Sequence, residues 1–293
     1  MILVRTMMEY RRALWSSWTQ TRVTMTDIPV NKAQLLGRAI APTAEWMGQL
    51  NPTWRAVRDA VTGHSIHVVS DSTKEKDMTD DLRLGLRLMN WMSSRPMVWY
   101  WWDHDWPRIV PPHVAPGRIH VNGGWAVPGV MEVHVYRREE AHKVLLHEMI
   151  HVLGMDVPQT TMDPIRDRFE KLLNRRLWPH LGEAFTEFFA EWLWAIASAP
   201  SLKGAASNWT AQLACAEMQA KQVWGRIRDL KTEDTSIFAY YILKWVLTRH
   251  CEEVLYSPVK SVVHWIEWWE ASRSLLDSAT SASETLRLGM TCQ

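Results

Sequence analysis

The 293-residue sequence predicts an α+β protein in which a small, twisted, mixed sheet comes before a mostly helical C-terminal part. Two observations predict this fold class. Three segments between residues 64 and 136 either alternate apolar with polar residues or are rich in β-branched and aromatic side chains, as strands are. From residue 139 onward, apolar residues recur instead with the period of a helix.

The three predicted strands are 64–70 (HSIHVVS), 96–102 (PMVWYWW) and 130–136 (VMEVHVY). An amphipathic stretch at 77–93, which begins with acidic residues, predicts a helix between the first two strands. These elements form a strand, helix, strand unit. The Pro- and Gly-rich stretch at 103–128 is expected to be a long ordered loop with one short strand near 119–121.

The helical part begins at 139–153, with Glu139 and Glu140 in its first turn and Gly154 where a left-handed cap would end the helix. Further helices are predicted at 164–177 and 181–197, and the last third is mostly helical. Residues before 64 are expected to be helical or irregular. We therefore predict an N-terminal extension (1–63), a core that carries the chemistry (64–197) and a helical C-terminal subdomain (198–293).

Composition narrows the possible partners and location. With 47% hydrophobic residues the chain can fill a core, and the 19 tryptophans are interpreted as part of that core. A net charge of +1 gives no bulk attraction to nucleic acid or to a membrane surface, and we expect neither partner. No signal peptide or transmembrane segment is recognised. Three cysteines without CxxC spacing argue against a disulfide framework, so an intracellular, cytoplasmic protein is expected. Composition does not indicate an oligomeric state.

The segment 147–151, HEMIH, predicts the chemistry. Two histidines four residues apart on a helix project from the same face and can bind one tetrahedral Zn²⁺ through neutral imidazole nitrogens. His147 and His151 meet this condition. Glu148 lies one step round the helix, so its carboxylate can reach a water on the metal and act as general base. We predict a zinc-dependent hydrolase, specifically a peptidase, with one Zn²⁺ per chain and a peptide or protein substrate.

The surroundings of this segment support a functional site. The residues next to the histidines are apolar enough to bury the helix, and buried ionisable groups are costly without partners; these residues are Val144, Leu145, Met149, Ile150, Val152 and Leu153. The strand predicted at 130–136 is interpreted as the edge of the cleft, to which an extended peptide adds as another strand. Met131, Glu132 and Val133 are therefore candidate substrate contacts.

Residues 65–197 resemble the zincin metallopeptidases, whose fold places a twisted sheet above an HExxH helix. The segment 181–192 (LGEAFTEFFAEW) is similar to the LNEGFAEY-like segment of the gluzincins. This resemblance implies that Glu183 is the third zinc ligand and that Glu187 orients a ligand histidine. A further similarity joins IHVNGG and VYRREEAHKVLLHEMIH to uncharacterised proteins of large DNA viruses that are classed as metallopeptidases.

A second zincin subfamily is a competing interpretation. Residues 147–156 (HEMIHVLGMD) resemble the HExxHxxGxxH signature of the matrixin-type metzincins through Gly154, and Met162 resembles their Met-turn. Val157, which cannot bind zinc, stands where that signature has its third histidine. Asp156 is one residue out of register. We favour Glu183 as the third ligand, then Glu187 and then Asp156.

Two questions stay open at the level of sequence. A tetrahedral oxyanion needs a hydrogen-bond donor besides the metal. In the gluzincins this donor is usually a Tyr or His, and Tyr240, Tyr241, His250 and His264 are the candidates here. The chain could also be a zincin-like scaffold that binds a partner without catalysis, because a fold alone does not establish an activity.

Overall fold

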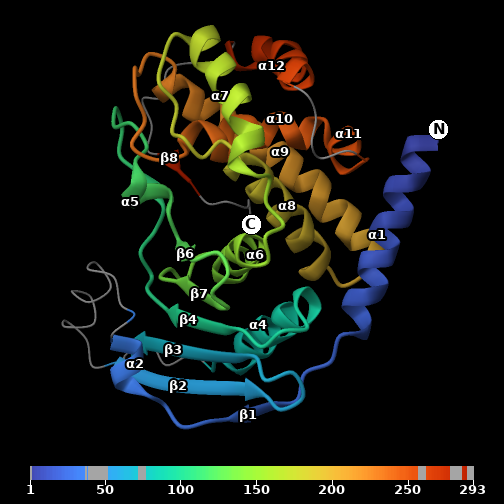
Figure 1. Ribbon diagram of the computed structural model, residues 1–293, viewed down its shortest axis with the longest axis vertical. Coiled ribbons are helices and arrows are strands. Elements are labelled where there is room, and N and C mark those ends of the chain that lie inside the picture. Colours follow the sequence, from blue (N-terminus) through green and yellow to red (C-terminus); the bar gives the residue numbers. More distant parts are fainter. Residues whose placement is uncertain are drawn as a thin grey trace. The chain divides into compact units, whose positions relative to one another are not determined.

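The computed structural model (Figure 1) describes residues 2–36, 38, 52–71, 77–256, 262–277 and 286–288. The chain forms two compact units. The sheet unit consists of residues 16–107 and 123–155, and the helical unit consists of residues 1–15, 108–122 and 156–293. Helix α1 (Ile2–Gln20) belongs in part to each. The predicted boundaries at 63/64 and 197/198 do not coincide with this division.

The sheet unit is built on a six-stranded mixed sheet. Its order is β1 (Met25–Asp27), β2 (Pro52–Asp59), β3 (Ser65–Asp71), β4 (Val98–Trp102), β7 (Glu132–Val135) and β6 (Gly124–Ala126). Strands β3, β4 and β7 are parallel, whereas β1, β2 and β6 pair antiparallel with their neighbours. The predicted α+β class with a mixed sheet is confirmed at this level.

Helices α4 (Thr79–Met92) and α6 (Ala141–Val152) cover one face of the sheet. Helix α4 connects the parallel strands β3 and β4, as the predicted strand, helix, strand unit requires. The rings of Trp99 and Trp101 lie edge-on to the imidazole of His142 on α6. The alternate residues Tyr100 and Trp102 stack against His134 on the opposite face. The aromatic strand is therefore buried on both faces, which confirms core filling as the role of its tryptophans.

Helix α6 lies within the predicted range 139–153, but it begins two residues later. Glu139 and Glu140 precede the helix rather than filling its first turn, and Glu140 has a φ of 61°. The helix ends as predicted at Gly154, whose φ of 63° is the left-handed conformation that glycine adopts without a Cβ penalty. Its apolar residues pack against β6 and β7.

Three expectations about the sheet are wrong. The segment before residue 64 is not only helical or irregular, because it supplies β1 and β2 as well as the short helix α2 (Lys32–Leu36). The strand expected near 119–121 is instead the helix α5 (Arg118–Val121). The segment 130–136 forms β7, which is not an edge strand, since it pairs with both β4 and β6.

Strand β6 reaches the edge position through a tight hairpin. The amide of Val130 donates to the carbonyl of Val127 across Pro128 and Gly129, and Gly129 has a φ of 83°. Proline at the second position and a left-handed glycine at the third are the residues that a type II turn requires. The Pro and Gly residues of the stretch 103–128 predict turns, but they do not reveal the three-residue strand β6 within it.

The helical unit confirms a mostly helical C-terminal part. Its elements are β5 (Ile109–Val110), α5, α7 (Gln159–Leu173), α8 (Glu183–Ala197), α9 (Leu202–Ile227), the π-helix η2 (Phe238–Leu243), α10 (Lys244–Arg249), α11 (Cys251–Tyr256), α12 (Val262–Asp277) and β8 (Leu286–Arg287). Helix α8 packs against α9, α10 and η2, and β5 pairs with β8. Buried tryptophans fill this unit, among them Trp192, Trp245, Trp265 and Trp269.

The cysteines differ from the prediction. Cys215 is disulfide-bonded, whereas the cysteine count and spacing were interpreted as arguing against a disulfide framework. Cys251, on α11, is a free thiol, and burial raises its pKa. Within the described ranges, no helix combines the length and the apolar character that a membrane crossing demands.

Candidate metal centre

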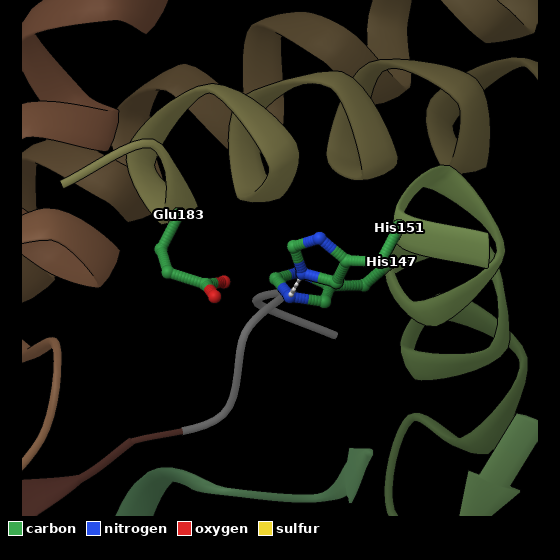
Figure 2. A group of neighbouring side chains, drawn as sticks. All are labelled: His147, His151 and Glu183. Atoms are coloured by element: carbon green, nitrogen blue, oxygen red, sulfur yellow. Dashed lines mark hydrogen bonds between the residues drawn. The ribbon is translucent and has the colours of Figure 1, made fainter. Parts of the chain in front are cut away.

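Helix α6 brings the two predicted histidine ligands together. The Nε2 atoms of His147 and His151 are 3.3 Å apart, and the two rings meet edge to face (Figure 2). His147 is buried and His151 is half-buried. One face of a buried helix therefore presents two imidazole nitrogens side by side.

The distance between these nitrogens fits a shared metal ion. Two nitrogens that each bind a tetrahedral zinc at about 2.0–2.1 Å lie about 3.3–3.4 Å from each other. The same distance also suits a hydrogen bond between two neutral imidazoles, one as donor and one as acceptor. A third donor is what distinguishes a metal site from a histidine pair.

Glu183 supplies a third donor. It is the first residue of α8, in the helical unit, and it is half-buried. One ligand atom from each of His147, His151 and Glu183 can be chosen such that all three atoms lie within 4.8 Å of one another (Figure 2). Two imidazoles and a carboxylate form a donor set that zinc accepts. Among the described residues this is the group of three His, Cys, Asp or Glu side chains that could hold a metal.

Glu148 lies on α6 beneath the edge strand. Its side chain is buried, with 7% of its surface exposed. A Cβ atom built on Gly124 of β6 would lie 3.1 Å from the Cγ atom of Glu148 and 2.8 Å from a methyl group of Val144. Strand β6 therefore passes in direct contact with the helix at the residue predicted to be the general base.

A buried network holds the segment that leads into α8. The guanidinium of Arg175 donates to the carboxylate of Glu233 at 2.7 Å and to the carbonyl of Ile227 at 2.7 Å. The same carboxylate accepts from the amides of Trp178 and Phe238. Because the chain from 174 to 182 connects α7 to Glu183, this network anchors the approach to the candidate ligand.

The acidic residues of α8 continue from Glu183 into the core of the helical unit. Glu187 and Glu191 follow at successive turns, and each is 1% exposed. The ammonium of Lys244 on α10 donates to Glu191 at 2.7 Å, and Lys244 is itself buried. The burial of Glu187 and Glu191 shows that this face of α8 is not a solvent-exposed acidic stripe. The role of Glu187 in orienting a ligand histidine stays a prediction.

The residues of the competing metzincin-like site are placed differently. Asp156 is half-buried but is not part of the three-ligand group. Met162 is 1% exposed and lies within α7, so it is not in a turn. The position of the third donor thus favours Glu183 over Asp156.

The four candidate oxyanion donors differ in burial and in the contacts that they make. The hydroxyl of Tyr241 donates to the carbonyl of Leu288 and is buried, as expected of a packed core residue. Tyr240 is half-buried on η2, and π-helical segments are frequent at functional sites. His250 stacks on Trp268. His264 is exposed on α12. Tyr240 is therefore the candidate that we retain for the oxyanion donor, and this role stays a prediction.

The predicted substrate contacts need correction. Met131, Glu132 and Val133 were assigned on the premise that their strand is the sheet edge, and β6 occupies that position instead. The carboxylate of Glu132, on β7, forms an ion pair with the guanidinium of Arg38 at 2.8 Å. Strand β6 was not predicted from the sequence, although the Gly123-Gly124 pair at its start is a signal for it. Glycine inside a strand often marks a close approach of another backbone or side chain.

His142, also on α6, is not part of the three-residue group that could hold a metal. Its Nε2 atom lies 2.7 Å from the carbonyl oxygen of Asp81 on α4, and its ring contacts two buried tryptophans.

Comparison of the chain with family models, with curated proteins and with solved structures finds no match.

Proposed function

We propose that the protein is a zinc-dependent metallopeptidase of the zincin type, with the gluzincin ligand set. The observation that carries the proposal is the group of His147, His151 and Glu183, whose ligand atoms lie within 4.8 Å of one another beside a buried Glu148. The three residues together would bind a single Zn²⁺. When bound, the metal would polarise a carbonyl and lower the pKa of a bound water to about 7.

Glu148 acts as the general base in this proposal. Its neighbour His147 points at the metal position, and Glu148 lies next to it on the buried helix. From there its carboxylate takes a proton from the attacking water and passes it to the leaving amine. Tyr240 is the proposed hydrogen-bond donor to the substrate oxygen as negative charge develops there.

The proposed peptide site lies along β6. Because β6 is the last strand of the sheet, an extended peptide can pair with its outer edge and extend the sheet by one strand. This role replaces the one first given to Met131, Glu132 and Val133. A peptide paired with this strand would bring its scissile bond close to Glu148, because β6 contacts α6 at that residue.

Metal analysis and one substitution test the proposal. Purified protein should contain about one zinc per chain, and Glu148→Gln should keep that zinc while losing hydrolysis of a mixed peptide library by at least about a hundredfold. Glu139→Gln, in the segment before α6, is the matched control and should retain activity. Protein that neither contains nor takes up zinc would contradict the proposal, and zinc binding without hydrolysis would indicate a scaffold.

A further inference from the structure

We infer that Gly124 is a positioning residue for Glu148: the absence of a side chain at residue 124 is what allows the edge strand to lie against the general base. This inference rests on the proposed function for its catalytic consequence. The steric part can be tested without metal and without substrate.

Three contacts leave no room for a side chain at residue 124. A Cβ atom there would lie 2.6 Å from the carbonyl oxygen of His134, 2.8 Å from Cγ1 of Val144 and 3.1 Å from Cγ of Glu148. Ordinary van der Waals contacts of a Cβ atom begin near 3.4 Å. The first contact is to the backbone of the neighbouring strand and the other two are to α6. Any residue larger than glycine must therefore move β6, the helix side chains, or both.

The contact with Glu148 has a specific consequence. Glu148 and Val144 are one helical turn apart on α6, so both side chains face β6 at the same point. Gly124 faces α6 because its cross-strand partner Val135 also lies on the helix face of the sheet. A methyl group at residue 124 would meet the carboxyl-bearing side chain before it met solvent. Displacing that side chain by a few tenths of an ångström moves the base relative to the water it must deprotonate.

A matched pair of glycine substitutions separates positioning from general packing. Gly124→Ala should reduce kcat by about three- to tenfold with little change in KM, since misplacement of a catalytic group by about 1 Å costs about a hundredfold and the shift here is a few tenths of an ångström. Gly85→Ala is the control, because Gly85 lies on α4 and a Cβ atom there would meet the ring of Trp99 at 2.4 Å rather than the side chain of Glu148. It should lower the urea midpoint by at least as much while leaving kcat within about twofold.

A double-mutant cycle in metal-free protein tests the contact itself. Gly124→Ala should lower the urea midpoint less in a Glu148→Ala background than in the wild type, because the alanine at residue 148 no longer carries the Cγ atom. When Val144→Ala is combined with Gly124→Ala, part of the lost urea midpoint and part of the lost kcat should be restored. If Gly124→Ala lowered the urea midpoint equally in both backgrounds, the inference would be overturned. The same holds if Gly124→Ala and Gly85→Ala lowered kcat in the same proportion to their loss of stability. Coupling in a protein without zinc or hydrolysis would leave the contact established and contradict only the proposed function.

Discussion

At the scale of single residues, the two interpretations of the HEMIH motif differ in the residue that provides the third donor beside the histidines. His147 and His151 sit on one helix, and sequence spacing alone brings them together. The third ligand comes from a different element, and Glu183 rather than Asp156 joins the group. In the proposed site, a carboxylate at this position would complete a set of three protein ligands and would leave one tetrahedral position open, as catalytic zinc sites do.

Replacing each candidate third ligand should give unequal losses of zinc. Glu183→Ala removes one of three ligands and is expected to lower zinc affinity by at least about a hundredfold. Asp156→Ala should change it by less than about threefold. Competition with a chromophoric chelator measures both affinities. If Asp156→Ala lost more zinc than Glu183→Ala, the metzincin-like arrangement would replace the one proposed here.

His134 shows a second kind of residue effect, on stability rather than on metal binding. Its ring is 1% exposed and stacks on Trp125 with centroids 3.8 Å apart. Burial, and to a smaller extent the charge of Arg38, lowers the pKa of His134 to about 4. Between pH 6.5 and 4 the unfolded chain takes up a proton that the folded protein does not. Stability is therefore lost as the pH falls through this range.

The variant His134→Phe should remove this pH dependence. The difference in free energy of unfolding between wild type and variant should shift by about 3 kcal/mol in favour of the variant from pH 7 to pH 4, since one pKa unit corresponds to about 1.36 kcal/mol. Urea denaturation of the metal-free proteins measures this shift. The exposed His264→Phe serves as control and should show no comparable shift. A pH-independent difference for His134→Phe would contradict the argument.

At the scale of elements, two buried ion pairs fix the helix that carries Glu183. Arg175 and Glu233 tie the connection before α8 to the start of η2. Lys244 and Glu191 tie the later turns of α8 to α10. Removing one partner of a fully buried pair leaves an uncompensated charge, which costs more than the pair contributes. The register of α8 therefore depends on charged residues that carry no obvious signal in the sequence.

Glu233→Ala is expected to be strongly destabilising and to weaken the metal centre. Loss of its carboxylate leaves the buried guanidinium of Arg175 without its counter-charge and the amides of Trp178 and Phe238 without their acceptor. The expected cost is about 3–5 kcal/mol. Zinc affinity should fall as well, because the chain leading to Glu183 loses its anchor. Asp229→Ala, which breaks an exposed pair with Arg228, should change stability by less than about 1 kcal/mol. Equal effects of the two substitutions in urea denaturation would disprove this role.

At the scale of the whole molecule, the proposed ligands come from two units of the chain. His147 and His151 belong to the sheet unit, and Glu183 belongs to the helical unit. A ligand that binds only the folded protein stabilises it by mass action, by about 2.7 kcal/mol at a hundredfold excess over its Kd. An ion that binds only the folded protein would therefore raise its stability.

Removal of metal should therefore lower the midpoint of thermal unfolding of the whole chain. We expect the chelator-treated protein to unfold several degrees earlier, and added zinc to restore the midpoint. In Glu183→Ala most of this zinc-dependent increase should disappear. Calorimetry with and without zinc measures the effect, and an identical midpoint in both conditions would show that no such ion stabilises the fold.

Local patterns in the sequence determined the elements and part of the site. Period and capping residues predicted α4, α6, α8 and the parallel strands, because these depend on neighbours within one or two turns. Spacing of four residues on a helix placed His147 beside His151 for the same reason. The tertiary structure alone decided which strand is the edge, that Gly124 lies on Glu148, and that buried pairs anchor α8. These features join residues tens of positions apart, and such contacts are selected by packing and burial, for which a single sequence carries no periodic signal.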